Sequence, residues 1–269
     1  MKLISNIALC SALALTLIGA NAYAELAGKH WARKANPVTL RVVDSVTIAW
    51  DAAFSTALQK WSESPVFDLN VVSSDDSATT REACGLIQGQ LRVCNYTYGT
   101  TGWLGLATIG VDANGHIDKA RVRLNDSYTA SWSVTGQRNH VACHEIGHTL
   151  GFDHMGSGQG TCMDVTQDLA SQWPSLANYE FLLALYGHAD TYNSYAGATT
   201  TTSTTTSTTT SSASTTCTGR NKKTCAASAF AASEEPSMGV KVSGDKKGQV
   251  WVSPRKDGGI WIHHVDLVP

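Results

Sequence analysis

Along the first part of the chain, apolar residues recur at spacings typical of strands in some segments and of helices in others. β-Branched residues dominate 38–43 and 66–72, which predicts a strand in each segment. Between them, large apolar residues recur every three or four positions over 47–62. This spacing predicts an amphipathic helix that ends near Pro65.

The second half of this region predicts a hairpin and two further helices. The apolar segments 103–111 and 116–124 flank the sequence Asp-Ala-Asn-Gly, which is a strong β-hairpin signal. A helix is expected over 136–150, and a last one begins at Ser175, whose hydroxyl can cap it. Its expected buried stripe is Leu176, Tyr179, Leu183 and Tyr186. This mixture of strands and helices indicates an α+β fold.

A tract of Thr and Ser divides the chain. Residues 199–216 are all Thr or Ser except Ala213, and such a tract lacks the apolar groups needed for a core. We therefore expect a solvated linker there. The segment 25–198 before it is long enough to form a domain with its own core.

The segment after the linker, 217–269, is expected to be a small β-rich module on this tether. Short apolar runs predict strands at 240–242, 249–252 and 260–262. Trp251 and Trp261 are either the core of this small sheet or contact residues for a sugar or a protein. A polysaccharide or cell-surface partner is the hypothesis for this module.

The N-terminus has the form of a secretory signal peptide, with Lys2 before an apolar run and small residues up to Ala24. The predicted signal peptide is 1–24, and a retained membrane anchor is the alternative. The rest of the chain has no second apolar run long enough to span a membrane, so a secreted protein is expected. The net charge of −2 and the charged fraction of 16% give no indication of nucleic-acid binding.

The cysteines agree with export. Of the 7 cysteines, Cys10 falls in the predicted signal peptide, and the even number that remains favours disulfides in an exported chain. The most local pairing joins Cys84 to Cys94, Cys143 to Cys162, and Cys217 to Cys225. The sequence does not prove this connectivity, and Cys143 or Cys162 as a metal ligand is the competing interpretation.

The strongest chemical signal is the sequence His-Glu-Ile-Gly-His-Thr-Leu-Gly-Phe-Asp-His that begins at His144. On a helix, His144 and His148 lie one turn apart on the same face, so both rings can reach one ion. Gly151 can adopt the left-handed conformation that ends a helix, which lets His154 return as a third ligand. Glu145 can reach a water on the ion. Three histidines leave one tetrahedral position open, as in catalytic zinc sites.

This segment resembles the His-Glu-x-x-His-x-x-Gly-x-x-His pattern of the metzincin zinc peptidases, and every fixed position matches. The spacing looks closest to matrixin-like or small bacterial secreted members. The resemblance implies a twisted mixed sheet with an antiparallel edge strand, a zinc helix, a methionine turn and a C-terminal helix. It implies that Met163 packs beneath the ligands as the turn methionine. Val165 stands where astacin-like members carry a tyrosine, so a tyrosine is not expected to assist there.

The expected function is that of a secreted zinc endopeptidase that acts on proteins or peptides. Glu145 would take the proton of a zinc-activated water and deliver it to the leaving nitrogen. An extended substrate is expected along the exposed sheet edge of Trp103, Leu104, Gly105 and Leu106. Trp103 and Leu104 fit a core equally well. By resemblance, 165–174 walls the pocket for the residue after the scissile bond.

Two other functions fit the sequence. One is a secreted binding or adhesion protein with a vestigial zinc site, and the intact Glu145 argues against it. The other is a zinc hydrolase of non-protein amides, whose metal chemistry would be the same. Only 25–35 precedes the first strand and it has no cysteine, so latency through a cysteine switch is not expected.

The other histidines have no partners at ligand spacing. These are His30, His116, His140 and His188. His263 and His264 would point to opposite faces of a strand, so they are poor joint ligands. Whether a structural metal accompanies the zinc is left open by the sequence.

Overall fold

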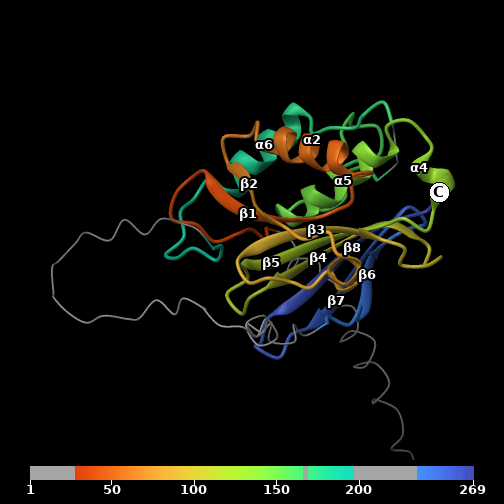
Figure 1. Ribbon diagram of the computed structural model, residues 1–269. Helices are drawn as coiled ribbons and strands as arrows, with labels where there is room; N and C mark the ends of the chain where they lie inside the picture. The colour runs from red at the N-terminus through yellow and green to blue at the C-terminus, as the bar shows by residue number, and fades with distance from the viewer. Residues whose placement is uncertain (1–27, 166–168, 197–234) are drawn as a thin grey trace, which may run out of the picture.

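One mixed sheet of eight strands forms the centre of the computed structural model, which describes residues 28–165, 169–196 and 235–269 (Figure 1). The first five strands are β1 (Val38–Ser45), β2 (Phe67–Ser74), β3 (Gln90–Tyr96), β4 (Trp103–Val111) and β5 (Ile117–Asn125). The last three are β6 (Val240–Gly244), β7 (Gly248–Pro254) and β8 (Ile260–Leu267). Their order across the sheet is β2-β1-β3-β5-β4-β8-β7-β6.

The direction of the strands divides the sheet into two parts. β1 pairs in parallel with β2 and β3, and β3 pairs in parallel with β5. From β4 onward every pairing is antiparallel. The strands predicted at 38–43, 66–72, 103–111 and 116–124 are therefore present, and the fold is α+β with a mixed sheet. In the β4–β5 turn, Gly115 has a φ of 87°, which a glycine adopts without strain.

Contrary to the expectation of a separate C-terminal module, the last three strands extend the main sheet. β8 pairs along the whole of β4, from Trp103 opposite Leu267 to Val111 opposite Ile260. The reason is that Leu104 to Val111 are buried. The main-chain N–H and C=O groups of β4 therefore need a hydrogen-bonded strand on each side. The strand positions predicted in this segment are confirmed, but the sheet is shared.

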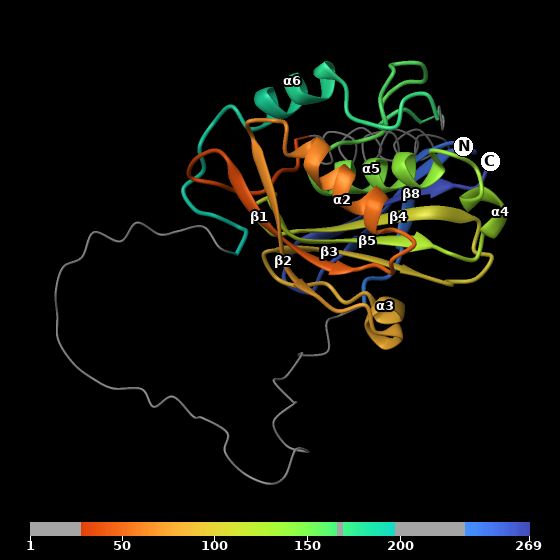
Figure 2. The ribbon, with the colours of Figure 1, turned by 45° about the horizontal axis from the view of Figure 1, so that its top comes forward.

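The main helices lie on one side of the sheet (Figures 1 and 2). They are α2 (Asp51–Trp61), α5 (Gln137–Thr149) and α6 (Leu176–Leu185), and the short helices are α3 (Ala78–Ala83) and α4 (Thr129–Trp132). α2 buries Phe54, Leu58 and Trp61 as its apolar period predicts. The Trp61 indole N–H donates to the carbonyl of Cys143, 3.0 Å away, which ties α2 to α5.

The last helix begins as predicted but buries a different face. Ser175 and Asn178 form a capping box at the start of α6. Leu176 is 72% exposed and Leu183 is 48% exposed, so the predicted stripe is wrong at both positions. The helix packs through Asn178 and Leu182 instead. Tyr186, at its end, is buried as predicted.

The described part of the chain contains two disulfides. They join Cys84 to Cys94 and Cys143 to Cys162, as the most local pairing predicts. Cys217 and Cys225 lie outside the described residues. No helix among the described residues has the length and apolar character to cross a membrane.

Candidate metal centre

α5 and the turn after it bring three histidines together. One ring nitrogen from each of His144, His148 and His154 lies within 4.8 Å of the other two. His144 and His148 face each other from successive turns of α5, with their Nε2 atoms 3.0 Å apart. Three imidazoles at this spacing can hold one metal ion. The predicted ligands are therefore confirmed as neighbours.

Gly151 provides the turn that returns His154 to the helix. Its φ is 105°, and a β-carbon there would clash with the carbonyl oxygen of Lys29. A residue with a side chain would have to adopt a strained backbone and displace the N-terminal segment. The glycine at this position therefore has a local structural reason, as the sequence predicts.

Hydrogen bonds fix the tautomers of two of the rings. His144 donates from Nδ1 to the carbonyl of Cys162 at 2.7 Å, and His148 donates from Nδ1 to the carbonyl of Phe152 at 2.9 Å. Because a carbonyl only accepts, both Nδ1 atoms carry the proton and both Nε2 atoms present lone pairs. His154 Nε2 is buried and has no hydrogen-bond partner among the described residues. A cation between these nitrogens would satisfy all of them.

Burial also keeps these rings uncharged. It lowers the pKa of His144 and of His148 well below the ordinary value, and neighbouring histidines lower both further. Neutral imidazole is the form that binds metal, so the site is prepared for an ion near neutral pH.

Glu145 projects from α5 towards β4. Its side chain is fully buried, and a β-carbon on Gly105 of β4 would clash with its Oε1 atom. Burial raises the pKa of Glu145 well above the usual range, and the charge of Asp266 on β8 raises it further. A buried carboxyl group with high proton affinity beside a cluster of imidazoles has the properties of a general base.

Met163 lies directly against α5. It is fully buried, and a β-carbon on Gly147 would clash with its sulfur atom. The Cys143–Cys162 disulfide joins α5 to the residue before Met163, with 6.0 Å between the two Cα atoms. The backbone N–H of Met155 donates to the Met163 carbonyl at 2.9 Å. Met163 thus packs beneath the helix that carries His144 and His148.

The C-terminal strands cover the cluster, which the sequence did not indicate. The ring of His264 on β8 stacks on His148, with centroids 4.1 Å apart. At the start of β7, a β-carbon on Gly248 would lie 2.7 Å from Cε1 of His154. The one indication in the sequence is that neighbouring residues on a strand point to opposite faces, so either His263 or His264 can face the cluster.

The edge predicted to receive a substrate is therefore not exposed. β4 lies between β5 and β8 over Gly105–Val111, so its main-chain groups are already paired. Leu104 is fully buried, which agrees with the core interpretation, and the Trp103 ring contacts Tyr98. The four residues Trp103, Leu104, Gly105 and Leu106 do not form a free edge in this structure.

Three ion pairs among the described residues attach the C-terminal segment to β5. Arg255, directly after β7, forms a bidentate salt bridge with Asp118, with hydrogen bonds of 2.7 and 3.0 Å. Glu235 accepts bonds from Arg121 at 2.7 and 2.8 Å and from Arg123 at 3.0 Å. Arg255 and Arg121 are almost fully buried, so each depends on its carboxylate.

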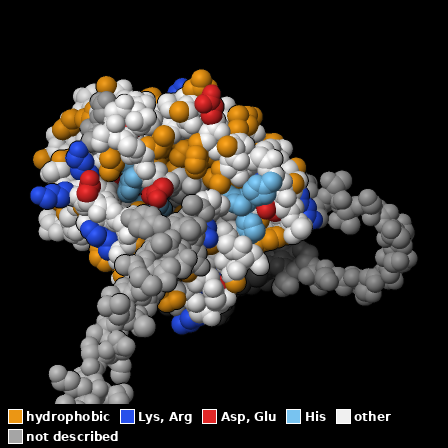
Figure 3. All heavy atoms as spheres, turned by 180° about the vertical axis from the view of Figure 1, so that it is seen from behind, with side chains coloured by type: hydrophobic (Ala, Val, Ile, Leu, Met, Phe, Trp, Pro, Cys, Tyr) orange, Lys and Arg blue, Asp and Glu red, His pale blue; other side chains and the backbone are white. Residues whose placement is uncertain are grey.

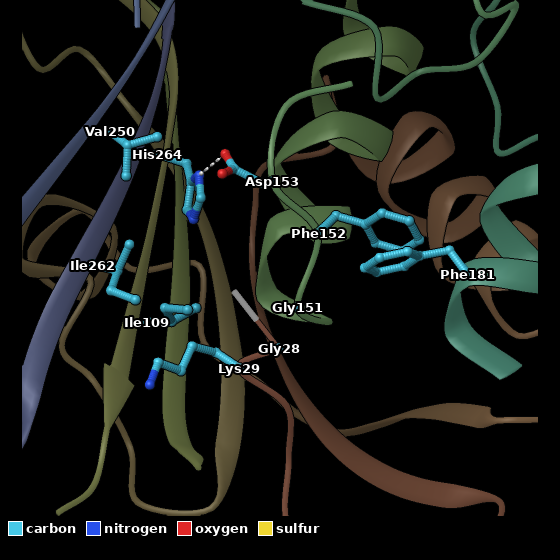
Figure 4. A pocket seen from close by; sticks show the side chains of 10 residues that line it. All are labelled: Gly28, Lys29, Ile109, Gly151, Phe152, Asp153, Phe181, Val250, Ile262 and His264. Carbon is cyan, nitrogen blue, oxygen red and sulfur yellow. Dashed lines mark ion pairs between the residues drawn. The ribbon is translucent and has the colours of Figure 1, made fainter. Parts of the chain in front are cut away.

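Two cavities are lined in part by residues of the C-terminal strands. One, of about 310 Å³, lies between the end of α5 and the strands β4, β7 and β8, and Figure 4 shows Asp153 and His264 paired at its rim. The other, of about 550 Å³, is lined by Gln137 and Val165 on one side and by Asp266 and its neighbours on the other.

Comparison with known proteins adds no family: no protein-family model matches this chain, and no curated protein shows significant similarity to it.

Proposed function

We propose that this chain is a secreted zinc-dependent endopeptidase of the metzincin type. The observation that carries the proposal is the convergence of three neutral imidazoles on one point, beside the buried carboxyl group of Glu145. Three nitrogen ligands with a fourth position for water are typical of catalytic zinc. The signal peptide predicted at 1–24 and the two disulfides among the described residues support secretion.

Each residue of the site then has a defined task. Zinc held by His144, His148 and His154 would acidify a water molecule and polarise a substrate carbonyl. Glu145 would accept the proton of the attacking water and pass it to the amine nitrogen as the peptide bond breaks. The apolar surroundings of Glu145 strengthen its hold on that proton between the two transfers.

The arrangement of elements supports the metzincin assignment. The mixed sheet has its first antiparallel strand at β4. His144 and His148 lie on α5 and His154 follows it, Met163 packs against α5, and α6 comes next in the chain. Zinc in particular is favoured by the all-nitrogen donor set, because Mg²⁺ and Ca²⁺ prefer oxygen ligands.

We also propose that the described arrangement is a latent form of the peptidase. β8 takes the hydrogen-bonding position along β4 that an extended substrate would use, and His264 and Gly248 lie against the metal ligands. The hairpin of β7 and β8 would have to withdraw before a protein substrate could bind. The cavity at Val165 would then be open to the substrate side chain after the scissile bond.

Digestion of a mixed peptide library by the zinc-loaded full chain tests the function. The wild type should cut peptides, the activity should disappear with a zinc chelator, and Glu145→Gln should keep its zinc and lose turnover. Glu180→Gln, an exposed carboxylate on α6, is the matched control and should behave as the wild type. Zinc-bound protein that cleaves non-protein amides but no peptide would contradict the proposal.

A further inference from the structure

A second group of histidines comes together in space from segments that lie outside α5. His30 precedes β1, His116 lies in the β4–β5 turn, and His188 and Asp190 follow α6. The Nε2 atoms of the three histidines each lie 3.4 Å from a carboxylate oxygen of Asp190. His188 Nε2 is 3.2 Å from His30 Nε2.

Outer hydrogen bonds orient two of these rings. His30 donates from Nδ1 to the carbonyl of Gly28 at 2.9 Å. Tyr192 donates its hydroxyl proton to Asp112 at 2.7 Å, so its oxygen accepts from Nδ1 of His116 at 2.8 Å. Both rings therefore direct an Nε2 lone pair at the carboxylate of Asp190. Lone pairs and a carboxylate repel one another, and the Arg33 guanidinium, 3.5 Å from Oδ2 of Asp190, offsets this repulsion only on its own side of the carboxylate. A cation among the three nitrogens would offset the rest.

Several spacings in the cluster are close to those around a tetrahedral ion, and the ligand atoms of His30, His116 and Asp190 all lie within 4.8 Å of one another. Zinc bonds of about 2.0–2.1 Å in a tetrahedron separate the ligand atoms by about 3.3–3.4 Å. His188 Nε2 lies 3.2 Å from His30 Nε2, and the three Nε2 atoms each lie 3.4 Å from Asp190, that of His30 from Oδ2 and those of His116 and His188 from Oδ1. Three imidazole nitrogens and one carboxylate oxygen are also a donor set that zinc accepts.

The cluster has an entry path from solvent. The side chains of His30 and Asp190 are each 9% exposed, whereas that of His188 is 54% exposed. On the face of the molecule shown in Figure 3, histidine side chains gather around an acidic side chain. An ion would reach the buried ligands past His188, which would then close the site.

We propose that His30, His116, His188 and Asp190 bind a second, structural zinc ion. With four protein ligands the site has no open position, so its role is to fasten chain segments together. Those segments are the N-terminal residues, the β4–β5 turn and the chain after α6. The inference does not depend on the peptidase proposal.

This ion would support the first metal centre from outside. Next to His30, the Trp31 indole N–H donates to the carbonyl of Thr149 in α5 at 2.8 Å. The preceding residue, Lys29, contacts Gly151 through its carbonyl oxygen. Holding His30 in place therefore also holds the turn that positions His154.

Metal counting on the full chain tests the proposal. The wild type should contain two zinc ions per chain, and His116→Gln/Asp190→Asn should contain one. His144→Gln/His148→Gln should also keep one, and its Co²⁺ form should show the intense visible absorption of a tetrahedral site. Asp68→Asn, an exposed aspartate on β2, should keep both ions.

A variant at the exposed His188 distinguishes loss of the metal site from misfolding of the protein. His188→Gln should fold normally and lose at least about tenfold in affinity for the second zinc against a competing chelator. One zinc per chain in the wild type, with the same content in His188→Gln and in His116→Gln/Asp190→Asn, would overturn the proposal. The cluster would then be a proton-sharing network of three histidines and Asp190.

Discussion

The imidazole of His264 lies parallel to that of His148, with centroids 4.1 Å apart and an angle of 11° between the planes. One ring comes from the last strand of the chain and the other from the helix that carries the candidate metal ligands. The contact places the C-terminal hairpin over the centre of the site. Two consequences follow from it: substrates cannot reach β4 in this arrangement, and the attachment of the hairpin should control activity.

Locking β8 onto β4 should abolish cleavage of protein substrates. Thr108 and His263 are direct cross-strand partners whose side chains meet at 3.1 Å on the face away from His264. A disulfide in Thr108→Cys/His263→Cys should therefore hold the hairpin closed without touching the metal ligands. Peptidase activity should be absent in the oxidised protein and return after mild reduction.

Thr108→Cys alone, treated in the same way, is the control for this lock. Equal activity in the oxidised and reduced double variant would show that the hairpin need not leave. No activity in either state would instead count against the peptidase proposal.

Loosening the hairpin should have the opposite effect. Arg255→Gln removes the bidentate partner of Asp118, whose largely buried carboxylate keeps only longer contacts among the described residues, with Lys119 at 3.6 Å and Gln88 at 3.3 Å. Breaking a buried pair costs on the order of 3 kcal/mol, which would shift the hairpin towards release. We expect kcat/KM for peptides to rise at least about tenfold. Lys256→Gln, on the adjacent exposed position, should leave kcat/KM unchanged, and an unchanged rate in Arg255→Gln would argue against latency.

Gly147→Ala should disturb the packing of Met163 against α5. The added methyl group would meet the sulfur of Met163 and the indole of Trp61, and neither has room to move within the core. Overpacking of this kind destabilises a protein by about 1–3 kcal/mol. Denaturant unfolding should show this loss together with weaker zinc binding. Gly156→Ala, where a β-carbon meets almost nothing, should leave both quantities unchanged.

Acid should destabilise the attachment of β8 through His263. Burial lowers the pKa of His263 from 6.5 to about 4, although its bond to the Ser237 carbonyl opposes the shift. The unfolded chain therefore binds the proton more tightly, and stability is lost as the pH falls from about 6.5 towards 4. Between pH 7 and pH 5 this residue should account for about 2 kcal/mol.

Unfolding of the wild type and of His263→Gln at both pH values measures this contribution. The variant should lose less stability than the wild type over that interval. An identical pH dependence for the two proteins would show that His263 titrates normally in the folded state.

Local geometry explains what could be predicted from the sequence. A helix turn sets the spacing of His144 and His148, and a single glycine reverses the chain towards His154, so the cluster follows from one short segment. The β4–β5 hairpin is equally local. In contrast, β3 was missed because buried polar residues break its apolar pattern: Asn95 is buried and its amide N–H donates to the hydroxyl of Thr47.

Contacts between distant segments explain what could not be predicted. The pairing of β8 with β4 joins residues on either side of the Thr/Ser tract, and no local pattern specifies that partner. The residues of the second cluster likewise come from three separate segments, and only His188 and Asp190 are close in the sequence, so the sequence does not reveal that His30 and His116 join them. α6 was expected to bury Leu176 and Leu183, but only one side of the helix meets the core.

The most direct test of the central claim is a zinc titration of the chelated full chain, with hydrolysis of a fluorogenic peptide as the readout. Activity should return in proportion to occupancy of the site formed by His144, His148 and His154. Glu145→Gln should take up the same amount of zinc, with turnover lower by a factor of at least about 100. Full occupancy of that site without peptide hydrolysis, in the wild type and in Arg255→Gln alike, would contradict the account.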